Sequence, residues 1–311
     1  MSEKFPKWLV IALTAIIALI LGFLVIALTR SKPAPPPVPL AEKAVKQNPE
    51  RKVIGRSVQN REIEAYTYGG GSTSAIKKLL FVGGIHGGYE WNSVLLAYEL
   101  MDYLKENLDT IPANLEVTVI PSANPDGVFR VVGKEGRFSL ADVPTGGDQS
   151  VGRFNAHGVD LNRNFDCNWS PTGVWKGKSV GTGSVAFSEP ESKALRNYIL
   201  ANRPDAVVMY HSAADAVYAS QCRKGILPET TKIMNTYAKG TGYKAVPVFD
   251  SYVVNGASED WLASENIPAI TVELKTHQTL EWERNLRGVK ALFELYGGEK
   301  QRLLKLEGAV E

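Results

Sequence analysis

A glycine-rich segment contains the first two side chains with the chemistry of a metal site. It reads Gly-Gly-Ile-His-Gly-Gly-Tyr-Glu-Trp over residues 83–91 and follows the short apolar run 79–82. His86 can bind a metal through an imidazole nitrogen and Glu90 through a carboxylate oxygen, and their spacing lets both reach one ion. Taken alone, a histidine in a glycine loop also fits a purely structural role. The segment therefore indicates a candidate metal site that needs a further ligand.

A second histidine, His211, follows the apolar run Ala-Val-Val-Met-Tyr at 206–210. A side chain at the carboxyl end of a buried strand faces the crevice in which open α/β sheets bind their ligands. Together with His86 and Glu90 it makes three protein ligands, and a fourth position left for water is typical of a catalytic zinc. The alternative is a histidine that packs in the core or supports the site from behind.

A carboxylate ends a third apolar run, because Glu273 follows Ala-Ile-Thr-Val at 269–272. A charged group is costly there unless it faces solvent, a partner or a site. Glu273 is thus a candidate general base that takes a proton from water. An ordinary glutamate at a strand end is the alternative.

Amide and guanidinium groups gather in a fourth segment, Gly-Val-Asp-Leu-Asn-Arg-Asn-Phe at 158–165. Asn162 and Arg163 lie side by side there, and their N–H groups suit a carboxylate ligand. Arg153, slightly upstream, adds a cation that can stabilise an oxyanion.

Alternating strands and helices must position these groups. The strand-like segments are 61–68, 79–82, 117–120, 206–210 and 269–273, and the helix-like segments are 90–108, 188–201, 229–239, 258–264 and 279–296. A capping box at 188–191 is expected to begin one helix, and Gly297-Gly298 to end the last one. The pattern predicts an α/β fold: one domain with a central mixed, mostly parallel sheet flanked by helices. The intervening stretch 124–187 reads as a long functional loop.

The N-terminal region predicts a membrane anchor. Residues 8–28 carry no charge, and 21 helical residues span about 31 Å, close to the thickness of a bilayer core. A cleaved signal peptide is the alternative, but its apolar region is normally shorter. We expect a single pass with the N-terminus inside and the large domain outside the cytoplasm. The predicted parts are a tail (1–7), the anchor (8–28), a proline-rich linker (29–49), the catalytic domain (50–298) and a C-terminal tail (299–311).

The charge balance excludes a nucleic-acid partner. The chain of 311 residues has 35 Lys and Arg against 33 Asp and Glu, a formal charge of +2. Residues 1–32 hold four of the cations and one Glu, so the remainder is almost neutral. A neutral domain lacks the basic field that nucleic-acid binding requires.

In order and in type, these motifs resemble the carboxypeptidase A-like zinc carboxypeptidases, over about residues 50–297. The resemblance rests on His86 with Glu90, Asn-Pro-Asp-Gly at 124–127, the 158–165 segment, His211 with Ser212, and the strand that ends at Glu273. It implies that His86, Glu90 and His211 bind one zinc ion and that Glu273 is the general acid and base. One departure concerns Glu90, because three residues separate it from His86 where the family usually has two.

The resemblance also implies how a substrate is held. Asn162 and Arg163 match the pair that grips a terminal carboxylate. Arg153 matches the arginine that polarises the scissile carbonyl, although Arg130 or Arg137 can also serve.

Tyr252 matches the mobile tyrosine that closes over the substrate, with a loop tyrosine in a packing role as the alternative. Glu259 occupies the position that selects the C-terminal side chain, where an acid favours a basic or amino-bearing residue; a glutamate that favours a helix N-terminus is the alternative. His157 and His277 are expected at the surface or behind the ligands. Two cysteines, 167 and 222, either form one disulfide or remain free.

We therefore predict a membrane-anchored zinc metallocarboxypeptidase whose substrate is a peptide with a free C-terminus or a peptidoglycan stem peptide. Three alternatives remain open. They are an amidase or endopeptidase of the same fold acting on peptidoglycan stem peptides, a deacylase of N-acyl amino acids, and a tethered binding module without activity.

Overall fold

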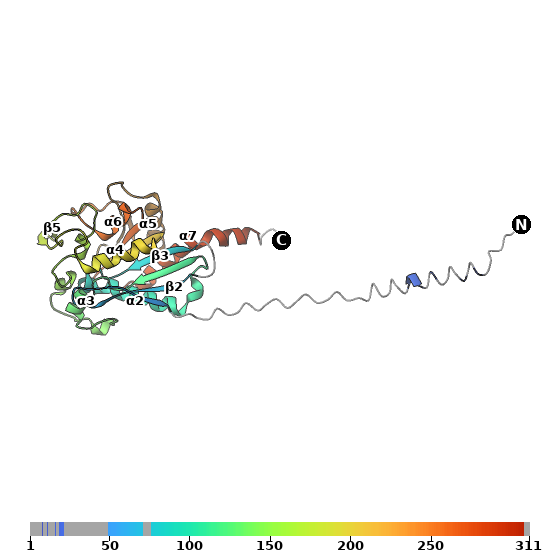
Figure 1. Cartoon of the computed structure of the whole chain (residues 1–311), viewed down its shortest axis with the longest axis horizontal. Helices are drawn as coiled ribbons and strands as arrows, with labels where there is room; N and C mark the ends of the chain where they lie inside the picture. The colour runs from blue at the N-terminus through green and yellow to red at the C-terminus, as the bar shows by residue number, and fades with distance from the viewer. Residues whose placement is uncertain are drawn as a thin grey trace. The chain divides into compact units, whose positions relative to one another are not determined.

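The fold is taken from a computed structural model (Figure 1). The residues that it describes are 8, 11, 16, 19–21, 49–70 and 76–307, with side chains described as far as 298. Among them, no helix combines the length and apolar character needed to cross a membrane. The anchor predicted at 8–28 and the linker at 29–49 lie almost entirely outside these residues. All elements below belong to the unit Lys46–Glu311.

Strands and longer helices alternate along this unit. The strands are β1 (Glu50–Arg56), β2 (Glu62–Gly69), β3 (Lys77–Val82), β4 (Leu115–Ile120), β5 (Gly173–Trp175), β6 (Lys178–Val180), β7 (Ala206–Ser212), β8 (Ala216–Ala219), β9 (Lys244–Val246) and β10 (Ala269–Leu274). The α-helices are α2 (Trp91–Glu106), α3 (Pro125–Val132), α4 (Pro190–Asn202), α5 (Pro228–Thr241), α6 (Ser258–Ser264) and α7 (Trp282–Glu307). The 3-10 helices are η1 (Gly87–Glu90), η2 (Leu108–Thr110), η3 (Leu140–Asp142), η4 (Gln149–Arg153) and η5 (Leu161–Arg163).

An eight-stranded sheet forms the centre, in the order β1-β2-β4-β3-β7-β10-β8-β9. The four middle strands β4, β3, β7 and β10 run parallel to one another. The flanking pairs β1–β2, β2–β4 and β10–β8 are antiparallel, while β8–β9 is parallel. The predicted mixed sheet is therefore confirmed. Because β3, β7 and β10 run parallel, their carboxyl ends lie on the same side of the sheet.

Each face of the sheet has its own hydrophobic cluster, because successive strand residues point to opposite faces. Phe81 belongs to the cluster formed with α2, α5 and α7, whereas its neighbours Leu80 and Val82 pack in the cluster formed with α4 and α6. Figure 1 shows α4 lying along the sheet beside β3. The strands that carry the candidate site are thus covered on both faces, as the near-continuous apolar runs predicted.

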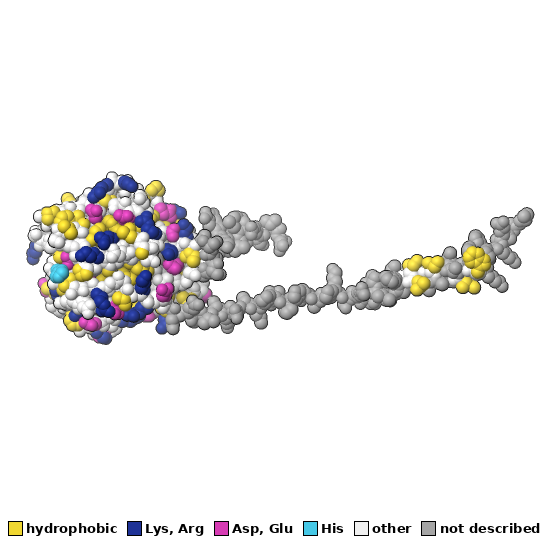
Figure 2. Space-filling view, in the orientation of Figure 1, with side chains coloured by type: hydrophobic (Ala, Val, Ile, Leu, Met, Phe, Trp, Pro, Cys, Tyr) yellow, Lys and Arg dark blue, Asp and Glu magenta, His cyan; other side chains and the backbone are white. Residues whose placement is uncertain are grey.

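Charges of both signs are mixed on the face of this domain that Figure 2 shows. Figure 2 shows Lys and Arg side chains interspersed with Asp and Glu over the face in view, as expected for a chain with a formal charge of only +2.

Two expected helix ends are wrong. Helix α7 does not stop at Gly297-Gly298 but continues to Glu307. A Cβ on Gly297 would lie 2.3 Å from Pro112 Cγ, so this glycine allows the helix to pass closely against that proline. The capping box predicted at 188–191 is also absent. Glu189 is the N-cap of α4, and Glu191 is buried, accepting hydrogen bonds from the Val58 amide and from Asn155.

The predicted loop 124–187 contains more regular structure than its composition indicated. Asn124 caps α3, because its side chain accepts a hydrogen bond from the Gly127 amide at 2.9 Å. Further along, β5 and β6 form a separate two-stranded hairpin. Three 3-10 helices lie in the remainder; η4 ends at Arg153, and η5 contains Asn162 and Arg163.

Candidate active site

The candidate metal ligands lie at the carboxyl ends of the parallel strands. His86 follows β3, Glu90 ends η1 immediately before α2, and His211 lies near the end of β7. Gly87 makes this approach possible: its φ is +47°, and a Cβ there would lie 2.5 Å from the Gly152 carbonyl oxygen. A larger residue would therefore push the loop away from its neighbour.

Three ligand atoms converge at one point. His86 Nδ1 lies 2.8 Å from Glu90 Oε1, and His211 Nδ1 lies 3.3 Å from both His86 Nδ1 and Glu90 Oε2. All three side chains are buried. A tetrahedral zinc ion with bonds of about 2.0–2.1 Å separates its ligands by about 3.3 Å. The three side chains therefore fit a zinc ion, and the extra residue between His86 and Glu90 does not prevent Glu90 from reaching the cluster.

Asp160 supports this cluster from behind. Its Oδ1 lies 3.4 Å from His86 Nε2, the nitrogen that points away from the cluster, and its Oδ2 accepts hydrogen bonds from Arg153. A carboxylate on the outer nitrogen orients a metal-binding imidazole. Asp160 is not among the predicted site residues, although it lies within the 158–165 segment.

Charge interactions within the cluster are strong. Burial alone would raise the pKa of Glu90, but attraction and hydrogen bonds from His86 and His211 outweigh it and hold that pKa well below its usual range. Burial opposes the charged form of His211, yet its contacts with Glu90 raise the His211 pKa to about 9. Each group thus stabilises the charge of the other, as expected where a cation would bind.

Glu273 lies beside His211, because the two residues pair in register between β10 and β7. Burial is the main cause that raises the pKa of Glu273 to about 8. Attraction from His211 lowers this pKa, and repulsion from Glu90 and Glu259 raises it further. Within the described part of the chain its Oε2 is buried and has no hydrogen-bond partner. This free oxygen can exchange a proton with a bound molecule.

Arg153 reaches the site, whereas the two other arginines considered do not. Its guanidinium is buried, donates to Asp160 at 2.9 Å and lies 3.8 Å from Glu90 Oε1. Arg130 donates instead to the Val151 carbonyl, and Arg137 pairs with Asp102 at the surface.

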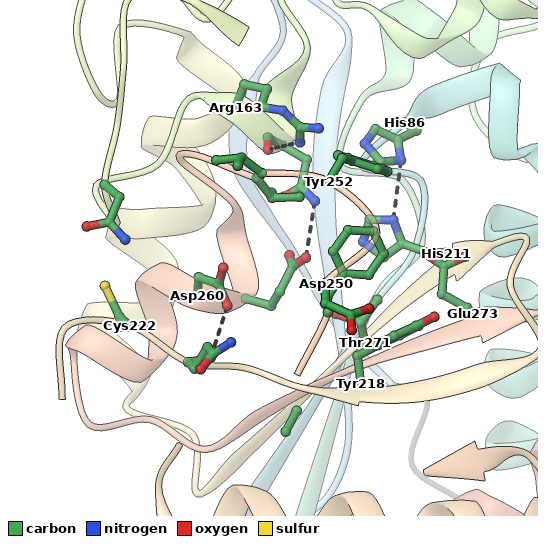
Figure 3. A pocket seen from close by; sticks show the side chains of 18 of the residues that line it. His86, Arg163, His211, Tyr218, Cys222, Asp250, Tyr252, Asp260, Thr271 and Glu273 are labelled. Atoms are coloured by element: carbon green, nitrogen blue, oxygen red, sulfur yellow. Dashed lines mark hydrogen bonds between the residues drawn. The ribbon is translucent and has the colours of Figure 1, made fainter. Parts of the chain in front are cut away.

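A cavity of about 520 Å³ adjoins the cluster and contains the candidate substrate-binding residues (Figure 3). Arg163 is 2% exposed and donates to the carbonyl oxygens of Asn162 (2.8 Å) and Val174 (3.5 Å). No carboxylate pairs with it among the residues that the structure describes. A buried cation that faces a cavity without a counter-charge is a site for an anion.

Two neighbouring residues of α6, Glu259 and Asp260, add carboxylates to the wall of this cavity, and Figure 3 shows Asp260 on the far side from His86. Glu259 accepts hydrogen bonds from Asn162 Nδ2 at 3.3 Å and from its neighbour Ser258. Burial opposes the charge on Glu259, but attraction from His211 keeps its pKa below the usual range. Asp260, which the sequence analysis passed over, accepts from the Gln221 amide; burial, followed by repulsion from Glu259, raises its pKa to about 7.

Tyr252 lies over the cavity rather than in the core. Its side chain is 49% exposed, and its ring packs edge-on against Phe249, which packs in turn on Tyr218. All three rings line the cavity.

The remaining histidines lie off the ligand cluster. His157 is exposed, with its Nδ1 2.7 Å from Glu189. His277 is partly buried, with its Nδ1 2.9 Å from Ser212 Oγ. Neither joins the three converging ligand atoms.

The two cysteines are paired. Cys167 and Cys222 form a disulfide with Cα atoms 6.1 Å apart. It connects the loop that follows Arg163 with the segment that follows β8. Both segments line the cavity, so the covalent link joins two of its walls.

Known proteins are similar to this chain in sequence and in fold. Carboxypeptidase B of Astacus astacus is 26% identical over 71% of this chain and 78% of its own length. Two solved structures are similar in fold. Thrombin-activatable fibrinolysis inhibitor has a TM-score of 0.64 at 19% identity, over 81% of this chain and 70% of its own. The murein-tripeptide amidase MpaA of Escherichia coli O157 has a TM-score of 0.56 at 23% identity, over 84% of this chain and 96% of its own.

Several curated relatives are longer than this chain, which spans 60% or less of their length. The sequence profile described as zinc carboxypeptidase matches residues 40–287, which include every candidate ligand and substrate-binding residue. The chain therefore belongs to the zinc carboxypeptidase family.

Proposed function

We propose that this chain removes the C-terminal residue from peptides as a zinc-dependent carboxypeptidase, anchored to a membrane with its catalytic domain outside the cytoplasm. Arg163 carries the proposal. Its guanidinium is buried, lines the same cavity as His86, His211 and Glu273, and has only carbonyl oxygens as partners in the described structure. A free terminal carboxylate would give this guanidinium the ion-pair partner that it does not have in the described structure.

Separate residues of the chain bind the substrate, transfer the proton and stabilise the developing charge. Arg163 holds the terminal carboxylate, and Asn162 is kept in place because its Oδ1 accepts hydrogen bonds from the Ser258 amide and hydroxyl. Glu273, with its unpartnered buried oxygen, takes a proton from the attacking water and passes it to the leaving amine. Arg153 lies where it can stabilise charge on the carbonyl oxygen.

A zinc ion held by His86, Glu90 and His211 would supply Lewis-acid chemistry at the carbonyl and at the attacking water. Tyr252, exposed at the mouth of the cavity, is placed to cover a bound substrate and exclude solvent.

The cavity favours a residue with an amino-bearing side chain. Glu259 and Asp260 place two carboxylates away from the candidate metal ligands, and attraction from His211 keeps Glu259 charged. Lysine and the diamino acid of a peptidoglycan stem both carry an amine that would pair with them. The same observation supports the second candidate function, an amidase or endopeptidase acting on stem peptides.

Placement outside the cytoplasm is proposed from two features. Residues 8–28 form an uncharged apolar stretch long enough to span a bilayer. The disulfide between Cys167 and Cys222 is a feature typical of oxidising compartments.

The proposal is tested with the zinc-loaded protein and peptides that differ only at the C-terminus. We expect hydrolysis of peptides that end in a free carboxylate, faster for C-terminal lysine or diaminopimelate than for phenylalanine, and little hydrolysis of the matching C-terminal amides. A chelator should abolish turnover, and added zinc should restore it. Equal rates on acids and amides would contradict the exopeptidase assignment, whereas hydrolysis of stem peptides alone would favour the second candidate.

A further inference from the structure

A second cavity, of about 490 Å³, meets the first at the candidate active site. Both cavities are lined by His86, Arg153 and Glu273. The second one does not include Arg163; part of its wall is formed by Tyr89, which lies between two candidate metal ligands, and by the β5–β6 hairpin. If the C-terminal residue of a substrate lies in the first cavity, the residue on the amino side of the cleaved bond lies in the second.

The hairpin brings a lysine to this second cavity. Lys176 and Gly177 form the two-residue turn between β5 and β6, and both have positive φ, +50° and +74°. Such turns match the twist of the strands that they join, and Asn or Gly is the usual first residue. A lysine in the left-handed region is an outlier that invites a functional explanation.

Aromatic rings hold the Lys176 ammonium at the edge of the cavity. Lys176 Nζ donates to Tyr89 Oη at 2.9 Å and lies 5.0 Å from the centre of the Trp175 ring. Tyr89 packs in turn against Trp175 and His277, with ring centres 5.1 and 4.7 Å apart. Contact with aromatic faces positions a cation without neutralising it.

Lys176 is the cation that remains available in this cavity. Arg153 also lies over Trp175, with Cζ 4.7 Å from the ring centre, but its guanidinium is already paired with Asp160. No carboxylate pairs with Lys176 in the described part of the chain. The two acids of this cavity, Glu90 and Glu273, have roles in the proposed function as ligand and base.

We propose that the second cavity binds a carboxylate carried by the substrate residue on the amino side of the cleaved bond, and that Lys176 is its partner. The inference rests on the proposed function for its orientation of the substrate. The carboxylate can be the side chain of an α-linked acidic residue or the free α-carboxylate of a γ-linked glutamate. Lys176 then determines specificity on this side as Arg163 does on the other.

The test compares peptides that share one C-terminal residue and differ only in the preceding one. One pair has α-linked Glu or Gln, and a second pair has γ-linked D-Glu with a free or an amidated α-carboxylate. We expect the acid of at least one pair to exceed its amide about 10-fold in kcat/KM, the size of one charge-assisted hydrogen bond at a partly exposed site. The pair with the larger ratio identifies the source of the carboxylate.

Charge variants make the test specific. K176E should remove or reverse the preference for the acid, and K176R should retain that preference. K178E is the matched control, because Lys178 is an exposed lysine of the same hairpin that lines neither cavity. An acid-to-amide ratio that is unchanged in K176E, or lowered equally in K178E, would overturn the inference.

Binding separates this inference from the proposed function. Calorimetric Kd values for the same peptides are measured on zinc-loaded E273Q and on the double variant E273Q/K176E. Tighter binding of the acid than of the amide, seen in E273Q but not in E273Q/K176E, supports the inference. It does so even if the wild-type protein hydrolyses none of the peptides, because that failure would reject only the proposed function. An acid-to-amide Kd ratio that is the same in E273Q and in E273Q/K176E would reject the inference, even if the wild type hydrolyses every peptide.

Discussion

Replacement of Arg163 by methionine tests whether the first cavity selects a free terminal carboxylate. Arg163 is 2% exposed, and among the described residues its N–H groups contact only the carbonyl oxygens of Asn162 and Val174. Methionine keeps most of the aliphatic stem, which passes within 3.6 Å of the position that a Cβ on Gly173 would take. The substitution therefore removes the charge with little change in packing.

The expected loss follows from this environment. A charge-assisted contact with a substrate carboxylate in a buried site contributes about 3 kcal/mol, which corresponds to about 10²-fold in kcat/KM. The folded protein should lose little stability, because the cost of keeping the guanidinium out of water offsets its two contacts with carbonyl oxygens and its attraction to Asp160. The thermal midpoint of R163M should therefore equal or exceed that of the wild type.

The assay measures kcat/KM for matched peptides ending in a carboxylate or in an amide. R163M should lose about 10²-fold on the acid and change little on the amide, so that the acid-to-amide ratio collapses. R130M serves as a control, because Arg130 is an exposed arginine that lines neither cavity. An equal loss on acid and amide, with zinc content unchanged, would refute the role given to Arg163.

Four further predictions concern the surrounding groups. E273Q should retain zinc by elemental analysis but lose about 10²–10⁴-fold in kcat, because proton transfer is removed; full turnover would contradict the assignment. D160N should weaken zinc affinity about 10–100-fold in a competition titration, and unchanged affinity would exclude a supporting role. Replacing Cys167 and Cys222 by serine should lower the free energy of unfolding by about 4 kcal/mol, since the bridge closes a separation of 55 residues; a denaturant titration measures this, and a loss below about 1 kcal/mol would contradict it. Asp260 binds its proton more tightly in the folded state, with a pKa of about 7 against an ordinary 3.8, so its contribution to stability should fall as pH rises from about 4 to about 7 and then level off. Thermal midpoints of D260N and wild type across this range should diverge accordingly, and parallel profiles would contradict the raised pKa.

The sequence predicted the strands and helices that position the ligands, because their signals are local. The apolar run 79–82 marks β3, and the helix expected at 258–264 coincides with α6. Burial on both faces of a parallel strand gives a continuous apolar run, and a polar residue at its end is visible for that reason. His211 and Glu273 could be found in this way.

Long-range contacts account for what the sequence did not predict. Gly297 looks like a helix end, yet it allows α7 to pass against Pro112, which is distant in sequence. Glu191 fits a capping box by spacing, but contacts with Val58 and Asn155 bury it instead. The role of Asp160 depends on its distance from His86, which no spacing reveals.

Specificity is the property that sequence patterns describe least well, because it depends on loops far apart in the chain. The walls of the two cavities meet at Glu273, but one contains Arg163 and the other Lys176. Only the fold shows that these two cations line different cavities, which in our proposal lie on different sides of the bond to be cleaved. A substrate that places a carboxylate against each of them satisfies both cavities, whereas a peptide with a neutral penultimate residue satisfies only the first. The combination restricts the enzyme more than either contact alone, since each absent carboxylate leaves a cation without its partner.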